Sequence, residues 1–367
     1  MTTSKALETL FEMCEESNAS DLHLAVGLPP RFRIKGSLVT RGDLRTFDAA
    51  DVEAIALELG RTAVPLAAGE GTERVREVLI REKSIDGAVT SPSGIRYRFN
   101  VYRANNACAV ALRRLDSRFR TFDELGVPRR LEEFCGERDG LFIVTGPTGS
   151  GKSTTLATMI DIINHSREGH IITIEDPIEY IHKSDKCNVN QREVGRDARS
   201  FNDALVESLR QDPDVILVGE VRELETIRTA LRAAETGHLV FTTLHAGDCV
   251  GAIERLVAVF PPDEQNSARR QLSLVLRGIF AQHLLQSSNG TRRPACELLV
   301  NTMACANHIA TGHTAQIYSV IETGGGNGMV TLDQSLERLV GEGAITPRAA
   351  LGLSRYPSQL KQRLGVV

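Results

Sequence analysis

The sequence contains no tryptophan, and aromatic residues make up only 5% of its 367 residues. It also lacks a surplus of positive charge, since 43 Lys and Arg stand against 47 Asp and Glu and leave a net charge of −4. Proteins that move along nucleic acids use basic residues against phosphates and aromatic side chains against bases. Because aromatic residues are scarce and basic residues are not in excess over acidic ones, the composition argues against a DNA-translocating motor.

Long apolar runs and paired cysteines are missing as well. Apolar runs such as 141–144 and 215–218 fall far short of the roughly 18 residues that span a bilayer. The first eight residues lack the basic start and apolar core of a signal peptide. The seven cysteines occur singly without a CxxC pair, which indicates reduced thiols rather than disulfides or structural zinc. We therefore expect a cytoplasmic protein.

The amino-terminal third mixes helix and strand patterns without a regular alternation. Apolar residues at helical spacing cover three segments, 4–17, 48–59 and 72–82. Period-two alternation predicts strands in four segments, 21–25, 31–36, 85–89 and 95–102. We interpret residues 1–115 as a small α+β domain and the polar residues 116–130 as a linker.

Beyond residue 130, short apolar runs alternate with longer helical patterns. The runs expected to be strands are 141–144, 171–174, 215–218 and 239–243. This alternation is typical of an α/β fold with a mostly parallel sheet and helices on both faces. We assign residues 131–367 to this second domain, and we expect its part beyond residue 269 to be mainly helical.

One segment matches the phosphate-binding pattern GxxxxGK[ST] in full. Its residues, with the one that follows, are Gly146, Pro147, Thr148, Gly149, Ser150, Gly151, Lys152, Ser153 and Thr154. The segment lies between an expected strand and a helical pattern, as this motif requires. Backbone N–H groups would cradle the phosphates, Lys152 would reach the β- and γ-phosphates, and the Ser153 hydroxyl would bind Mg²⁺. The sequence therefore predicts a site for ATP and Mg²⁺.

Carboxylates follow two further strands of the expected sheet. Glu175 and Asp176 end one strand, and Glu220 ends another. Ligands of open α/β sheets bind at the carboxyl ends of strands, so these groups are expected to face the nucleotide. Gly219 stands where many P-loop ATPases carry a metal-shell Asp, which leaves Glu220 as the base for water and Asp176 as a candidate Mg²⁺ ligand. The alternatives are an ordinary acidic turn after the first strand and a solvated ion pair of Glu220 with Arg222.

Two histidines flank the last expected strand. Extended residues advance about 3.3 Å each, so His238 and His245 should lie ~23 Å apart and cannot contact one phosphate. His245, at the carboxyl end, is the candidate sensor of the γ-phosphate. We expect His238, at the other end, in a structural role or at a subunit contact.

Arginine is concentrated between residues 96 and 130, where nine Arg and no Lys stand against three acidic residues. Arginine favours bidentate contacts with phosphates and carboxylates. One interpretation is that Arg96, Arg98 and Arg113 complete the ATP site from outside the P-loop domain, as arginine fingers do. The other is that they form ordinary ion pairs with acidic residues of the chain.

Taken together, these motifs resemble the secretion-superfamily hexameric ATPases. The segments that carry the resemblance are the phosphate loop, IEDPIE at 174–179, VGEVR at 218–222 and TGHLVFTTLH at 236–245. Four more are typical of the type IV pilus retraction branch, namely ASDLHL at 19–24, PPRFRI at 29–34, VNQREV at 189–194 and LETIR at 224–228.

The resemblance implies a homohexameric ring of subunits with a PAS-like N-terminal domain and a RecA-like ATPase domain, with ATP between them. In the family, the residues matching Glu175, Glu220, His238 and His245 serve hydrolysis, and glycine is typical at position 219. The ring would engage an inner-membrane platform protein at the inner face of the cell membrane, without inserting. It would drive pilus retraction, and hence twitching motility.

One segment departs from the family pattern. The C-terminal retraction motif of the family, roughly AIRNLIRE, aligns with residues 305–311, which include Ala306, His308 and Ala310 and lack both arginines and the leucine. The ATPase motifs thus match the family, whereas the motif that the family uses for retraction does not. An accessory retraction motor, a pilus-assembly or secretion ATPase and a non-catalytic ring subunit are the alternatives. The absence of a CxxC pair argues against an assembly ATPase with a tetracysteine insert.

Overall fold

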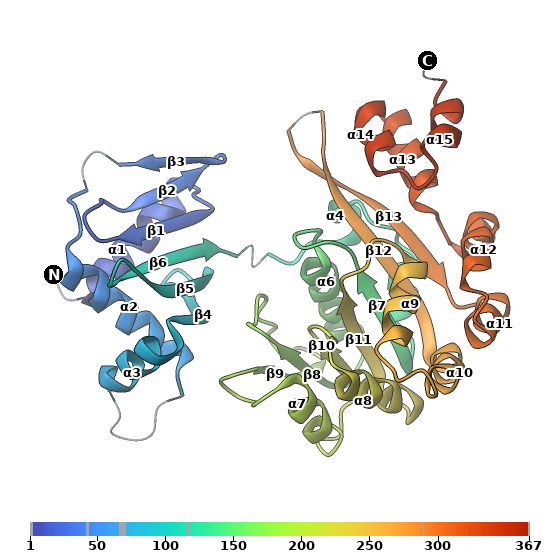
Figure 1. The fold of residues 1–367 in the computed structure, drawn as a ribbon, viewed down its shortest axis with the longest axis horizontal. Helices are drawn as coiled ribbons and strands as arrows, with labels where there is room; N and C mark the ends of the chain where they lie inside the picture. The colour runs from blue at the N-terminus through green and yellow to red at the C-terminus, as the bar shows by residue number, and fades with distance from the viewer. Residues whose placement is uncertain (1–2, 42–43, 66–70, 116–117, 289, 366–367) are drawn as a thin grey trace. The chain divides into compact units, whose positions relative to one another are not determined.

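The computed structural model describes residues 3–41, 44–65, 71–115, 118–288 and 290–365 (Figure 1). The chain divides into two compact units. The first consists of residues 1–118 with 176–181 and 192–200, and the second of residues 119–175, 182–191 and 201–367. Of the expected linker, residues 116 and 117 lie outside the described residues. Residues 119–130 group with the second unit and contain helix α4 (Phe122–Leu125).

The first unit is built on an antiparallel sheet with the strand order β3-β2-β1-β6-β5-β4. Its strands are β1 (Asp21–Ala25), β2 (Arg31–Ile34), β3 (Ser37–Thr40), β4 (Ser84–Thr90), β5 (Arg96–Ala104) and β6 (Ala107–Arg114). Its helices are α1 (Thr3–Glu16), α2 (Ala49–Ala63) and α3 (Thr72–Glu82). The sequence pattern predicts all of these elements except β3 and β6.

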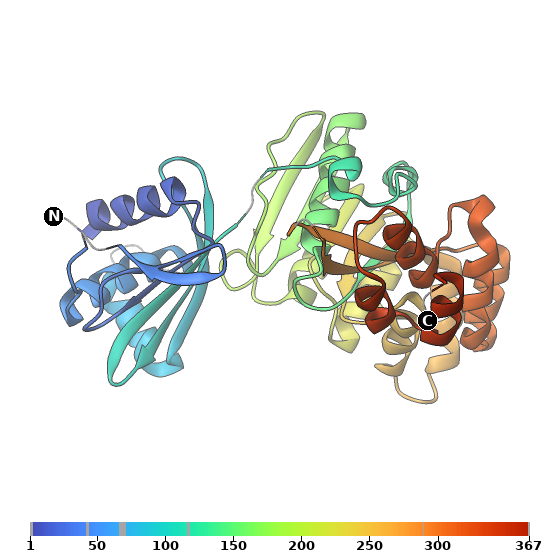
Figure 2. The same cartoon turned by 90° about the horizontal axis from the view of Figure 1, so that it is seen from above.

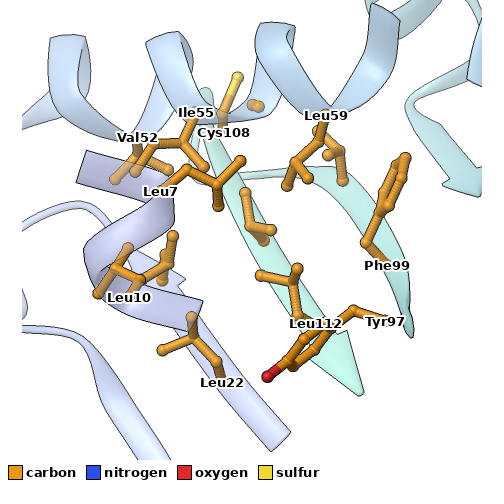
Figure 3. Close-up of a cluster of buried hydrophobic side chains, with 14 of the residues drawn as sticks. Leu7, Leu10, Leu22, Val52, Ile55, Leu59, Tyr97, Phe99, Cys108 and Leu112 are labelled. Carbon is orange, nitrogen blue, oxygen red and sulfur yellow. The ribbon is translucent and has the colours of Figure 1, made fainter. Parts of the chain in front are cut away.

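Strand alternation gives this sheet one apolar and one polar face. Tyr97 and Phe99 of β5 are at most 1% exposed and point into the same core as Ile55 of α2 and Leu112 of β6 (Figure 3). Arg98, between the two aromatic residues, is exposed. Since successive side chains of a strand point to opposite faces, Arg98 lies on the face away from the helices.

The second unit has a sheet with the strand order β13-β12-β7-β11-β10-β8-β9. Its strands are β7 (Gly140–Thr145), β8 (Gly169–Glu175), β9 (Cys187–Glu193), β10 (Val215–Val218), β11 (Leu239–Leu244), β12 (Leu276–Gln286) and β13 (Arg292–Val300). The central strands β12, β7, β11, β10 and β8 run parallel, and β13 is antiparallel to β12. The predicted α/β class is therefore confirmed.

Helices cover this sheet and continue beyond it. They are α5 (Leu131–Cys135), α6 (Lys152–Ser166), α7 (Phe201–Ser208), α8 (Leu224–Glu235), α9 (Cys249–Ala258), α10 (Gln265–Val275), α11 (Met303–Thr311), α12 (Ile317–Thr323), α13 (Leu332–Gly341), α14 (Pro347–Leu353) and α15 (Pro357–Arg363). The last three gather around a small apolar cluster with Leu336 and Leu360, red in Figure 2. Within the described ranges, no helix combines the length and apolarity needed to cross a membrane.

The prediction of a mainly helical region beyond residue 269 is wrong for the hairpin of β12 and β13. These strands pair from Gly278 with Val300 to Gln286 with Arg292. A continuous apolar run does not reveal whether its period is 3.6 or 2. Pairing of β12 with β7, which lies far away in the sequence, decides in favour of a strand.

Candidate nucleotide site

The predicted phosphate loop connects the end of β7 at Thr145 to the start of α6 at Lys152. Three of its residues, Gly146, Gly149 and Gly151, have φ angles of 145°, 77° and 94°. Side chains disfavour this part of conformational space, so the path of the loop requires glycine at these positions. At Gly146 there is also no space, because a Cβ atom would lie 2.3 Å from the carbonyl oxygen of Gln282.

Two polar side chains of the loop, Lys152 and Ser150, show how the loop is arranged. Lys152 Nζ donates to the carbonyl oxygens of Gly146 and Pro147 at 2.9 and 3.1 Å. Ser150 Oγ is buried without a hydrogen-bond partner. A buried hydroxyl without a partner is uncommon in folded proteins. Together with the helix N-terminus that follows, it fits a site in which an anion supplies the missing partner.

The carboxyl ends of three neighbouring strands lie beside this loop. In β11, Leu244 pairs with Thr145 of β7, and Thr242 pairs with Val218 of β10. His245 follows directly after β11, and Glu220 follows β10 after one residue, Gly219. His245 Nε2 lies 3.7 Å from Glu220 Oε2, and both side chains are about one third exposed, at 32% and 27%. The structure thus brings two of the predicted catalytic residues together.

Glu220 also makes the ion pair that the sequence offers as its alternative role. Arg222 Nη2 lies 2.8 Å from Glu220 Oε2. Burial lowers the pKa of His245 below its ordinary value, and Lys152 lowers it further, whereas Glu220 opposes the shift. Lys152 of the phosphate loop and the two strand-end residues therefore share one electrostatic environment. A neutral imidazole in that environment can accept a proton or donate one.

Glu175 ends β8, on the other side of β10. Its Oε1 accepts hydrogen bonds from Thr173 Oγ1 at 2.6 Å and from Gln191 Nε2 at 3.1 Å. The N–H of Gly219 donates to the carbonyl oxygen of Ile174 at 2.8 Å, so the ends of β8 and β10 are in contact. A Cβ atom at position 219 would lie 3.1 Å from that oxygen. A larger side chain at position 219 would therefore make a tight contact with the end of β8.

The other two predicted residues are Asp176, which directly follows Glu175, and His238. Asp176 is exposed and belongs to the first unit. His238 precedes β11, and its Nδ1 lies 3.0 Å from the carbonyl oxygen of Ala233. The six residues of β11 lie between His238 and His245, so the two histidines are ~23 Å apart along the strand. His238 is therefore at the opposite edge of the sheet from the phosphate loop.

The three predicted arginines all lie in the first unit. Arg96 is buried, with Nη2 3.1 Å from Glu193 Oε2 and Nε donating to the carbonyl oxygen of Ile178 at 2.6 Å. Arg113 donates to Asp21 Oδ1 at 2.9 Å, although its side chain is 72% exposed. Arg98 is exposed and opposes Arg113 across β5 and β6. Arg96 and Arg113 thus both form ion pairs with carboxylates of the first unit.

A metal site made by the protein alone requires several ligating side chains close together. The residues that the structure describes contain no group of three or more His, Cys, Asp or Glu placed to hold a metal ion. Mg²⁺ bound with a nucleotide needs no such group, since phosphates and water supply most of its ligands. The exposed hydroxyl of Ser153, in the first turn of α6, fits that arrangement.

Comparison with known proteins identifies the family. A family model described as type II/IV secretion system protein matches residues 88–335. The chain belongs to this family. As a type II/IV secretion system protein it is an ATPase, and the resemblance inferred from its motifs is confirmed.

Among its relatives are two pilus proteins of Pseudomonas aeruginosa. The type IV pilus retraction ATPase PilT is 42% identical over 348 residues, which cover 95% of this chain and 98% of PilT. The type IV pilus ATPase PilU is 37% identical over 363 residues, which cover 96% and 90%. The crystal structure of the pilus retraction motor PilT with bound ADP is 41% identical, with a TM-score of 0.88 over 97% of this chain and 98% of that one. This family member thus has the fold of PilT along nearly its whole length.

Proposed function

We propose that this ATPase is a pilus retraction motor, which converts ATP hydrolysis into work on a type IV pilus and so supports twitching motility. The observation that carries the proposal is the grouping of Lys152, Glu220 and His245 at one edge of the sheet. That grouping occurs in a chain that aligns with the retraction ATPase PilT along nearly its whole length.

The proposed architecture is the one that the family resemblance implies. Residues 1–115 would form a PAS-like domain and residues 131–367 a RecA-like domain, and six subunits would form a homohexameric ring. The ring would lie in the cytoplasm, against an inner-membrane platform protein. The absence of a membrane-spanning helix from the described residues is compatible with a peripheral position.

The proposed chemistry starts with binding of ATP by the phosphate loop. Backbone N–H groups of the loop and Lys152 would hold the phosphates, and Ser153 would hold Mg²⁺, which neutralises charge on the transferring phosphoryl group. Glu220 would orient the attacking water and accept its proton. His245, within reach of Glu220, would position that water against the γ-phosphate.

The other predicted site residues would have supporting roles in binding or structure. Glu175, held by Thr173 and Gln191, would bind a water of the metal shell, and Asp176 stays a candidate Mg²⁺ ligand. Arg98 and Arg113, whose side chains are exposed, are the candidates to contact a nucleotide, and Arg113 would exchange its ion pair with Asp21 for that contact. His238 would have a structural role, which its contact with Ala233 supports.

Replacement of the proposed base tests the enzymatic part. We expect Glu220→Gln to lower turnover roughly 10²- to 10⁴-fold, because a general base contributes that much to a rate. Affinity for ADP should stay within about twofold, because Glu220 is not a phosphate contact. The matched control is Glu235→Gln, an exposed carboxylate at the end of α8 that should leave both values unchanged. Unchanged turnover in Glu220→Gln would remove this residue from its role.

Deletion of the gene in the native host distinguishes pilus retraction from pilus assembly. Many surface pili with loss of twitching would support retraction, whereas cells without pili would support an assembly ATPase. A second candidate is an accessory motor like PilU, which the altered segment Ala306–Ala310 of helix α11 favours. Normal pilus number with weakened retraction force would support that candidate instead.

A further inference from the structure

Gln282 is a buried polar residue in an otherwise apolar part of β12. Its side chain is 2% exposed. In the pairing of β12 with β7, Ala281 lies opposite Thr145, the last residue before the phosphate loop. Gln282 therefore lies beside Gly146, although the two are far apart in the sequence. No local pattern in the sequence predicts this position.

The amide of Gln282 is hydrogen-bonded at both ends to the region of the phosphate loop. Its Oε1 accepts from Thr155 Oγ1 at 2.8 Å, in the first turn of α6. Its Nε2 donates to the carbonyl oxygen of Ser150, within the loop. One side chain thus connects the loop to the helix that follows it.

Gln282 also occupies the space that two glycines of the motif leave open. A Cβ atom at Gly151 would lie 2.8 Å from Gln282 Nε2, and one at Gly146 would lie 2.3 Å from the carbonyl oxygen of Gln282. A loop with several glycines loses much conformational entropy when it is ordered. Contacts that hold such a loop in one shape before the ligand arrives reduce the free-energy cost of binding.

The next residue makes a similar contact with the other side of the site. His283 Nε2 donates to the carbonyl oxygen of Gly247 at 2.7 Å. Gly247 lies two residues after His245. Consecutive residues of β12 therefore contact both loops of the candidate nucleotide site.

We propose that Gln282 is a positioning residue, which holds the phosphate loop in the shape that binds nucleotide. The inference rests on the proposed nucleotide site. It assigns Gln282 a role through its contacts with Ser150 and Thr155 and not through a contact with the nucleotide. Replacing the amide with an apolar group would leave the Ser150 carbonyl and the Thr155 hydroxyl without their partner, and both lie in or beside the loop. The loop would then have to be ordered when ATP binds.

The test compares Gln282→Met with Asn164→Leu in the full chain. Asn164 is a matched control, because its buried amide also donates one hydrogen bond and accepts one, to Lys183 O at 2.8 Å and from Asp185 N at 3.1 Å. It lies near the far end of α6 from the phosphate loop. The measurements are the Kd for ADP by calorimetry, KM and kcat for ATP, and the melting temperature.

We expect Gln282→Met to raise the Kd for ADP and the KM for ATP roughly 10- to 100-fold, the range that corresponds to a lost buried hydrogen-bond partner. Its kcat should stay within about threefold, because no group that touches the reacting atoms is removed. Asn164→Leu should lower the melting temperature and leave Kd and KM unchanged. Equal Kd values for Gln282→Met and the wild type would overturn the inference, and so would a shift of the same size in Asn164→Leu.

If Gln282→Met fails to fold, the variant Thr155→Val provides a second test of the same proposal. It removes only the hydroxyl that donates to Gln282, and we expect a Kd for ADP raised roughly threefold to tenfold. An unchanged Kd in this variant would count against the inference. Failure of the wild-type protein to bind ADP would instead reject the proposed function, so the two failures are distinguishable.

Discussion

The carboxyl edge and the amino edge of the sheet in the second unit are the two ends of the same parallel strands. The polar groups at these two edges differ in their surroundings. At the carboxyl edge, the buried atoms Ser150 Oγ and His182 Nδ1 have no hydrogen-bond partner. His182 belongs to this edge because its N–H donates to Gln191 Oε1, and Gln191 in turn donates to Glu175 at the end of β8. The edge also contains the glycines of the phosphate loop in left-handed conformations.

At the amino edge, several polar groups are satisfied within the protein, although Asn301 Oδ1, beside the start of β12, is buried without a partner. His238 Nδ1 contacts the carbonyl oxygen of Ala233, and the N–H of His170 donates to Asp214 Oδ2 at 2.8 Å. The N–H of Gly140, at the start of β7, donates to the carbonyl oxygen of His238 at 3.0 Å. The carboxyl edge differs in having the positive-φ glycines of the phosphate loop and the unpartnered Ser150 hydroxyl just before a helix N-terminus, which mark it as the edge arranged for an anionic ligand.

Matched glycine substitutions at the two edges should give the largest difference. We expect Gly146→Ala to weaken ADP binding at least roughly 100-fold, because its Cβ would overlap a backbone oxygen 2.3 Å away and displace the loop. The control is Gly237→Ala, at the amino edge, where φ is also positive at 100° but a Cβ would meet no atom within 4 Å. It should cost about 1 kcal/mol of stability and leave ADP affinity intact. Calorimetric titration measures both.

Equal losses of affinity in Gly146→Ala and Gly237→Ala would contradict the distinction between the edges. In that case the effect of either substitution would be a general loss of folding. Circular dichroism of both variants separates this outcome from a local one. A folded Gly146→Ala protein that does not bind ADP would place the ligand at the carboxyl edge.

The two histidines that flank β11 provide the next test. We expect His245→Gln to lower kcat roughly 100-fold, the size of effect typical for a residue that helps to move or orient a proton. His238→Gln removes a contact with one backbone oxygen at the other edge, and its kcat should stay within about twofold of the wild type. Steady-state phosphate release measures both. A large loss in His238→Gln and none in His245→Gln would reverse the assignment.

The elements that the sequence predicts are those whose cause is local. The phosphate loop follows from its glycines and from the strand and helix on either side. Glu220 and His245 could be placed at one edge because neighbouring parallel strands end together, although the sequence does not reveal their 3.7 Å separation. Strands β10 and β11 are also correctly predicted, because their short apolar runs are visible in the local sequence.

The elements that the sequence does not predict depend on distant partners. Strand β12 reads as a helix until its pairing with β7 is known, and Gln282 cannot be assigned to the phosphate loop without that pairing. Arg96 is another case, because its partner Glu193 is 97 residues away. From the sequence alone, ion pairing and nucleotide binding are equally good explanations for this arginine.

The smallest expected effect comes from protonation of His182 at acid pH. It changes the free energy of unfolding and does not affect turnover at neutral pH. Burial lowers the pKa of His182 from its ordinary value of 6.5 to about 4. The unfolded chain therefore binds a proton between these pH values that the folded protein excludes, and stability falls as the pH falls. We expect the wild type to lose about 2 kcal/mol of stability from this group between pH 7 and pH 5.

Urea unfolding at several pH values measures this loss. The free energy of unfolding of His182→Gln should fall less steeply with pH than that of the wild type, whereas Asn164→Leu should be less stable with an unchanged pH dependence. Parallel curves for His182→Gln and the wild type would mean that the carboxyl edge tolerates the proton, and His182 would then not distinguish the two edges.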